Sequence, residues 1–258
     1  MRGMQVAEAL RCRGWNCVAV AGPSLWALRG VRDSIIVCVK SQPHRHHALH
    51  AKRNILILDA LDHDPRLLRD CEGACAAVLF GSEATRDVYL AQYPAGRAFV
   101  FYHHADPHIL PHHPVMQAKL VYVGETVNSI GSKGGLRGVA LLDFKKADWR
   151  ERLRAYNAHF SGRLDVTKSV VKLANCSASH AVFIGGKEPG AVELLGDDYP
   201  YFLTSLQPQD VQCCLDRYNA SFGSPLWHEA RARVIAQQQR LSLAASVAQY
   251  ERLFAELT

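Results

Sequence analysis

The chain has 258 residues, of which 48% are hydrophobic and 21% are charged, a balance typical of folded soluble proteins and not of disordered ones. No apolar run approaches the ~20 residues that a membrane-spanning helix needs, and Arg2, Glu8 and Arg11 stand where a signal peptide would have its apolar core. The net charge of +6 at pH 7 suits an anionic substrate or a membrane surface, and no long run of Lys and Arg indicates nucleic-acid binding. We therefore expect a cytoplasmic protein that binds no nucleic acid.

The first half of the chain alternates amphipathic segments with short apolar ones. Apolar residues at helical spacing predict a helix over residues 3–13, and Ser82 is placed to cap a helix that runs to Gln92. A further helix is predicted from Asp64 to Cys71. Short apolar runs predict strands at residues 16–21, 34–39, 54–58, 76–80 and 98–102. Because these strands are apolar throughout and alternate with helices, the sequence predicts an α/β fold whose parallel sheets are covered on both faces.

A histidine- and proline-rich segment, HHADPHILPHHP at residues 103–114, interrupts this alternation. A second alternating series then runs from Lys119 to about Asn219, and residues 225–257 read as one long helix or two. The predicted domains are therefore residues 1–114 and 115–224, followed by a C-terminal bracing helix at 225–258.

The stretch from His159 to Pro200 carries the strongest functional signal. It places Arg163 before a helix that opens near Thr167 and carries Lys172; an apolar strand, a glycine-bearing turn and a second helix with Glu193 follow. Two helix N-termini near one strand end, together with basic side chains, favour phosphate binding. A carboxylate one turn into the second helix can accept hydrogen bonds from sugar hydroxyls. The pattern therefore indicates a nucleotide-sugar pocket.

The segments KLANCSASHAVFI and PGAVELLGDDYPYFL within this stretch resemble the donor-binding half of bacterial GT-B-type glycosyltransferases. KLVYVGETVN at 119–128 is similar to the strand that opens their C-terminal domain, and RGMQVAEALRCRG at 2–14 to the first helix of their N-terminal domain. The resemblance implies two Rossmann-like doubly wound domains that face a cleft. It also implies a C-terminal helix that crosses back to the N-terminal domain.

By this resemblance, Arg163 and Lys172 would bind the donor diphosphate and Glu193 would bind ribose or sugar hydroxyls. Asn175 and Gly190 belong to the same resembling segments and are expected at the donor site, as are Gly124 and Glu125, which follow the strand LVYV. The alternative reading is ordinary: solvated surface charges, a helix-start acid favoured by the helix dipole, and a plain turn at Gly124.

An inverting transfer needs a general base on the acceptor side. The candidates are Asp59, Asp62 and His63 after the predicted strand at 54–58, and His103 and His104 after the strand at 98–102. Alternatively, Asp62 or Asp64 caps the following helix and the histidines belong to the linker. A retaining transfer requires neither base, and the sequence leaves the stereochemistry open.

Metal binding is not required by the sequence. His46 and His50 are four residues apart in PHRHHALH, but Lys52 and Arg53 follow and no acid stands beside them, so an exposed polar helix is the favoured reading. The eight cysteines, without an export signal, are expected as reduced thiols. We expect no cofactor, the nucleotide sugar being a substrate.

A doubly wound domain normally begins with a strand before its first helix, whereas this sequence begins at the turn MRGMQ. We expect either a later start than in the natural protein or another segment in that position.

The leading hypothesis is a glycosyltransferase that moves a sugar from a UDP-, GDP-, CMP- or dTDP-linked donor to a glycan, lipid-linked or small-molecule hydroxyl. The resemblance implies bacterial surface-polysaccharide or glycoconjugate synthesis, with a peripheral contact at the inner membrane compatible with the charge. The alternatives are a non-catalytic nucleotide-sugar- or glycan-binding relative and a nucleotide-sugar epimerase of the same fold.

Overall fold

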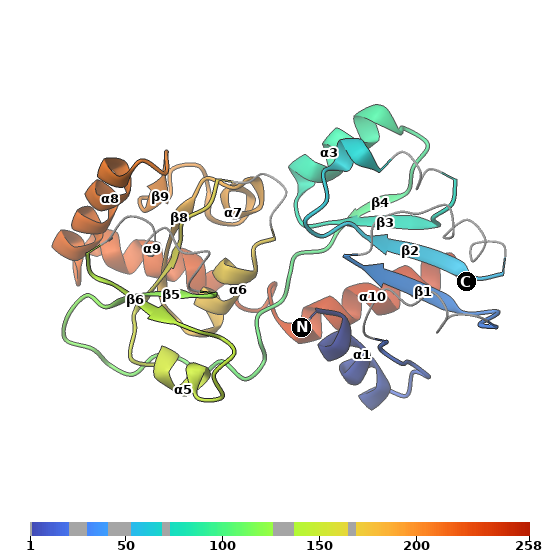
Figure 1. Cartoon of the computed structure of the whole chain (residues 1–258), viewed down its shortest axis with the longest axis horizontal. Helices are drawn as coiled ribbons and strands as arrows, with labels where there is room; N and C mark the ends of the chain where they lie inside the picture. Colours follow the sequence, from blue (N-terminus) through green and yellow to red (C-terminus); the bar gives the residue numbers. More distant parts are fainter. Residues whose placement is uncertain (1, 21–29, 41–52, 69–72, 126–136, 165–168) are drawn as a thin grey trace. The chain divides into compact units, whose positions relative to one another are not determined.

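The computed structural model describes residues 2–20, 30–40, 53–68, 73–125, 137–164 and 169–258, and the chain divides into two compact units (Figure 1). Unit 1 comprises Met1–His103, Val166–Ser169 and Leu243–Thr258, and unit 2 comprises His104–Asp165 and Val170–Ser242. Each unit has its own sheet, and every strand pair in both sheets is parallel. The predicted α/β fold with parallel sheets is confirmed.

Unit 1 contains a sheet whose strands follow one another in chain order. The order is β1-β2-β3-β4, with bounds β1 Ile35–Val39, β2 Ile55–Asp59, β3 Ala77–Phe80 and β4 Ala98–Val100. β3 is buried along its whole length, and β2 is buried at every residue except Ile55. Strands that are covered on both faces need apolar side chains at consecutive positions, which explains the runs ILIL and AVLF.

Helices cover both faces of this sheet. The helices α1 (Arg2–Cys12) and α10 (Leu243–Leu257) lie side by side, and their apolar residues form one core with Ile57 and Leu79 (Figure 1). The alternate strand residues, Leu58 and Val78 among them, form a second core with Tyr89 of α3 (Glu83–Gln92). Since successive side chains of a strand point to opposite faces, the two cores lie on opposite sides of the sheet.

Two predicted elements of unit 1 differ in the structure. Residues 16–20, expected as part of a strand at 16–21, form no strand pairing within the described ranges, and Val18 is 76% exposed. Trp15, directly before them, packs against Phe254 of α10 and donates to Glu251. In place of the helix expected at 64–71, the described part has a 3-10 helix, η2 (Pro65–Leu67), capped by Asp64.

Unit 2 contains a sheet in the order β6-β5-β7-β8-β9. The strands are β5 Leu120–Val123, β6 Val139–Leu142, β7 Ala158–Ser161, β8 Val182–Gly186 and β9 Phe202–Leu203. The chain leaves β5 for β6 on one side and then returns to β7 on the other. The order therefore reverses between β5 and β7, and in open parallel sheets the carboxyl ends beside such a reversal form the usual ligand site.

Several helices of unit 2 begin at a proline. The helices of this unit are α5 Trp149–Leu153, α6 Val171–Ala178, α7 Pro189–Leu195, α8 Pro208–Ser221 and α9 Pro225–Ala236. Three of them start with proline, whose fixed φ and missing N–H suit the first helical position. The segment expected as one helix or two at 225–257 is two helices, α9 in unit 2 and α10 in unit 1. Among the described residues, no helix is long and apolar enough to cross a membrane.

Candidate functional site

The candidate site lies in unit 2, at the carboxyl ends of β5, β7 and β8, where the strand order reverses. Tyr122 comes from β5, Arg163 follows β7, Lys172 is the second residue of α6, and Glu188 follows β8 and stands directly before α7. Two of these residues, Arg163 and Lys172, were predicted from the sequence as diphosphate ligands, and the structure brings them together.

Lys172 is the most unusual group of the site. Its ammonium nitrogen lies 3.6 Å from the centroid of the Tyr122 ring, and this nitrogen is buried with no hydrogen-bond partner among the residues that the structure describes. Burial, followed by the charge of Arg163, lowers the pKa of Lys172 to about 7, against a partial opposing effect of Glu188. A buried ammonium that lacks an acceptor is costly, and an anionic ligand would supply one.

Tyr122 joins the two cations. Its side chain is 3% exposed, its ring lies against Lys172, and its hydroxyl is hydrogen-bonded to the side chain of Arg163. Burial raises the pKa of Tyr122, so the phenol stays protonated at neutral pH and its oxygen accepts from the guanidinium.

Glycines fix where these groups stand. A Cβ atom at Gly124 would lie 2.7 Å from the Tyr122 hydroxyl oxygen, so the ring occupies the space beside this glycine. A Cβ atom at Gly186 would lie 1.8 Å from the carbonyl oxygen of Arg163, which shows that the backbone at Arg163 is pressed against the end of β8. The sequence indicated a ligand-approach role for Gly124; in the structure Tyr122 fills that space.

Glu188 is a site residue that the sequence reading missed. It is 5% exposed, and its negative charge acts on Lys172. An acid directly before a proline at a helix start was the available signal, since that position is the N-cap. The two predicted residues of α7, Gly190 and Glu193, lie within the same helix, the first buried and the second half-buried.

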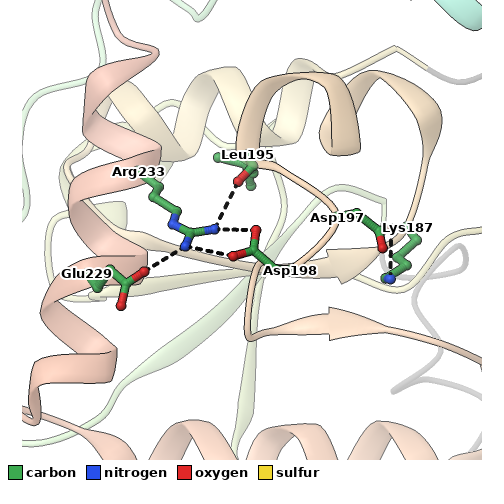
Figure 2. A network of polar contacts seen from close by, with 6 residues as sticks. All are labelled: Lys187, Leu195, Asp197, Asp198, Glu229 and Arg233. Carbon is green, nitrogen blue, oxygen red and sulfur yellow. Dashed lines mark hydrogen bonds and ion pairs between the residues drawn. The ribbon is translucent and has the colours of Figure 1, made fainter.

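A polar network holds α7 at its other end (Figure 2). Arg233 of α9 donates to both carboxylate oxygens of Asp198, at 2.7 and 3.0 Å, and to the carbonyl of Leu195, the last residue of α7, at 3.3 Å. Glu229 accepts a further bond from Arg233 at 2.6 Å, and Lys187 beside Glu188 pairs with Asp197 at 2.9 Å. The network ties the helix that carries Glu188 to α9.

Two other predicted donor-site residues have partners of their own. The side-chain oxygen of Asn175 accepts from the backbone N–H of Asp106 at 3.0 Å, and Asp106 in turn pairs with Arg150 at 2.6 Å. Glu125 pairs with Lys145 at 2.6 Å. The side chain of Asn175, on α6, is thus hydrogen-bonded to the segment after His104, and the side chain of Glu125 is partly exposed.

The residues predicted as candidate bases follow two different strands, β2 and β4. Asp62, with a φ of 67°, pairs with Lys40 at 2.7 Å beyond the ends of β1 and β2, and the buried Nδ1 atom of His63 has no hydrogen-bond partner. His103 and His104 are both buried, the first closing unit 1 and the second opening unit 2. Asp62 and His63 follow β2 and His103 follows β4, and β3 lies between these two strands in the sheet of unit 1.

The histidines at 44–50 lie outside the described residues. Within the described ranges, no group of three or more His, Cys, Asp or Glu side chains is placed to hold a metal ion.

Comparisons with known proteins identify a fold and no sequence family. No family model matches the chain, and no curated protein matches it by sequence. Solved structures do match. A glycosyltransferase from Rickettsia africae ESF-5 aligns over 99% of this chain and 93% of its own, with a TM-score of 0.66 and 10% identity.

TarM aligns over 89% of this chain at 14% identity, with a TM-score of 0.64. Anabaena HepE in complex with UDP and glucose aligns over 81% of this chain at 14% identity, with a TM-score of 0.59. The chain spans 57% of TarM, 73% of HepE and 60% of the matched chain of the GtfA/B complex. These neighbours are GT-B-type glycosyltransferases, and at such identities the likeness shows the fold that they share with this chain.

Proposed function

We propose that the chain is a glycosyltransferase that moves a sugar from a nucleotide-sugar donor to the hydroxyl of a glycan, a lipid-linked acceptor or a small molecule. The observation that supports it most is the buried ammonium of Lys172, which lies near Arg163 at the strand-order reversal and has no hydrogen-bond partner in the described ranges. The fold supports it further, since HepE, a structural neighbour, was solved with UDP and with UDP-glucose.

The chemistry of the site suits a diphosphate leaving group. Negative charge develops on the nucleotide diphosphate as the sugar departs, and fixed cations in a partly buried site stabilise that charge strongly. Lys172 and Arg163 would supply this stabilisation without a metal ion. Glu188, directly before α7, and Glu193, within α7, would accept hydrogen bonds from sugar or ribose hydroxyls.

The acceptor base and the biological setting extend this proposal. Asp62, His63, His103 and His104 stay candidates for the base of an inverting reaction. Synthesis of bacterial surface polysaccharide or another glycoconjugate, at the cytoplasmic side of the inner membrane, is the setting we propose.

A thermal-shift screen against UDP, GDP, CMP and dTDP tests the donor site. A nucleotide at 100 times its dissociation constant should stabilise the protein by about 2.7 kcal/mol. We expect one nucleotide to raise the Tm, and Lys172→Met to remove that rise. Lys187→Met is the matched control, because Lys187 is an exposed lysine paired with Asp197. No rise with any nucleotide, or equal rises in both variants, would contradict the donor site.

A product assay then separates the three activities considered. A transferase releases the free nucleotide in step with glycosylated acceptor. An epimerase returns an isomerised nucleotide sugar with the nucleotide still attached. A binding protein gives the thermal shift and neither product over a broad acceptor panel.

A further inference from the structure

Tyr122 is a buried aromatic residue that touches both cations of the candidate site. In β5 it reads as an ordinary core residue, since it stands in the apolar run LVYV. Its contacts are not those of a core residue. The Lys172 ammonium lies 3.6 Å from its ring centroid, well inside the ~6 Å range in which a ring face attracts a cation.

The hydroxyl of the same ring is bound to the second cation, Arg163. The ring occupies space that a side chain at position 124 would need, because a Cβ atom at Gly124 would stand 2.7 Å from the hydroxyl oxygen. The backbone at Arg163 likewise lies so close to Gly186 that a Cβ atom there would stand 1.8 Å from the Arg163 carbonyl oxygen. The sequence thus leaves space on two sides so that one aromatic ring can reach both cations.

Two like charges so close together repel each other, and the charge of Arg163 does disfavour the charged form of Lys172. Within the described part of the chain, the other charged or titratable groups that act on Lys172 are Glu188, which opposes this effect, and His159, which is neutral because burial lowers its pKa to about 3. Without a contact to each cation, the pair would separate or lose a proton. Tyr122 provides both contacts: the ring face for the ammonium and the hydroxyl oxygen for the guanidinium.

We propose that Tyr122 is a positioning residue that holds Lys172 and Arg163 together as one receptor for the two phosphate groups of a nucleoside diphosphate. This inference rests on the proposed function. It adds that the preference of the site for two phosphates over one depends on a residue that need not touch the ligand.

Two substitutions separate the two contacts. Tyr122→Phe keeps the ring under Lys172 and removes the oxygen that Arg163 binds, and Tyr122→Leu removes both. We expect the affinity for pyrophosphate to fall about threefold to tenfold in the first and about tenfold to 100-fold in the second, from typical strengths of a charged hydrogen bond and a cation–π contact. Affinity for the matching nucleoside monophosphate should fall less, because one phosphate engages fewer of the paired charges.

The experiment is isothermal titration of the full chain with pyrophosphate, and with the di- and monophosphate of the nucleoside that the screen selects. Tyr199→Phe is the matched control. Tyr199 is also a buried tyrosine of unit 2, but its hydroxyl donates to the carbonyl of Phe183, so its loss should weaken the fold and leave the diphosphate preference unchanged.

The pH dependence gives a second readout that general destabilisation does not move. Because the ring face favours the ammonium form, Tyr122→Leu should shift the pH midpoint of pyrophosphate binding downward, whereas Tyr122→Phe and Tyr199→Phe should not. Unchanged preference and midpoint in both Tyr122 variants would overturn the inference while the donor site stands. A loss confined to Tyr122→Leu would overturn the role of the hydroxyl. If the wild-type protein binds neither pyrophosphate nor any nucleotide, the proposed function itself fails.

Discussion

Unit 1 and unit 2 each place a cation near the carboxyl ends of parallel strands, but they treat it in opposite ways. In unit 1, Arg2 of α1 pairs with Asp59 at the end of β2 at 2.8 Å and donates to the carbonyl of Phe101 at 3.0 Å. Tyr250 of α10 donates to the same carboxylate at 3.3 Å. In unit 2, Lys172 has a ring face beside it, and its nitrogen has no hydrogen-bond acceptor.

On the proposed function, Arg2 is a charge that stabilises the fold, whereas Lys172 is a charge that binds a ligand. The pair of Arg2 and Asp59 connects α1, β2 and α10 inside the core, so its attraction is used within the folded chain. The buried nitrogen of Lys172 has the ring face of Tyr122 and the charge of Glu188 near it but, among the described residues, no hydrogen-bond acceptor. Its charge is therefore compensated only in part, which costs stability in the free protein and would leave the charge available to a ligand. Substitutions at the two places should therefore change stability in opposite directions.

The largest effect is expected at the pair in unit 1. Asp59→Ala leaves the guanidinium of Arg2 buried without its carboxylate, and the free energy of unfolding should fall by about 3–5 kcal/mol. Denaturant unfolding measures it. Asp64→Ala is the control, because Asp64 pairs with Arg66 at the surface and caps only the short η2, so its loss should lower the stability far less. Equal, small losses in the two variants would show that the Arg2 pair is not structural.

The opposite sign is expected at Lys172. Lys172→Met keeps the length of the side chain and removes the partly compensated charge, so the ligand-free protein should melt a few degrees higher. The same variant should bind the nucleoside diphosphate about 10- to 100-fold more weakly, as expected for loss of a charged hydrogen bond. Calorimetry with and without nucleotide measures both. A lower Tm in the free variant would mean that Lys172 holds the fold and would remove the contrast with Arg2.

The pH dependence of binding sharpens the contrast further. With its pKa lowered to about 7, Lys172 loses its proton as the pH rises through neutrality in the free protein, whereas a bound phosphate favours the charged form. Affinity should therefore be highest below pH 7 and fall by up to about tenfold per pH unit above it. Comparison with Lys172→Met corrects for titration of the phosphate itself. A slope that is the same in both proteins would contradict the assignment.

The smallest effect is expected at the network of Figure 2. Arg233→Ala removes partly exposed ion pairs to Asp198 and Glu229 and a bond to the last carbonyl of α7, and the Tm should fall by about 1–3 °C. The hydrogen bond from Arg233, together with its charge, lowers the pKa of Asp198, so this contribution is present above the usual carboxyl range and is lost as the pH falls from that range through the lowered pKa. A variant whose stability matches wild type at both neutral and acidic pH would remove the network from the account.

The sequence predicted most of the strands because a strand buried on both faces must be apolar throughout. The run at 16–20 shows the limit of that reasoning: its residues have strand propensity, but Trp15, directly before them, contacts α10, whose residues lie more than 230 positions away. Local pattern carries no information on such a partner.

The candidate site was likewise predictable only where its residues stand in a local sequence pattern. Arg163 and Lys172 were recognisable because basic residues next to helix starts are a local feature. Tyr122 and Glu188 were not, because their roles follow from which strand ends lie next to each other, and the order β6-β5-β7-β8 is not written in any one segment. Tyr122 stood in an apolar run, where core packing explains it without reference to a ligand. Glu188 stood at a helix start, although in the structure its side chain makes no capping hydrogen bond to α7.

The most direct test of the account is isothermal titration of the wild-type chain and of Lys172→Met with the nucleoside diphosphate from the screen and with its nucleoside. We predict that the wild-type protein binds the diphosphate much more tightly than the nucleoside, and that Lys172→Met loses that preference while it stays folded and more stable. Equal diphosphate affinity in the two proteins would show that the buried ammonium is not the phosphate receptor.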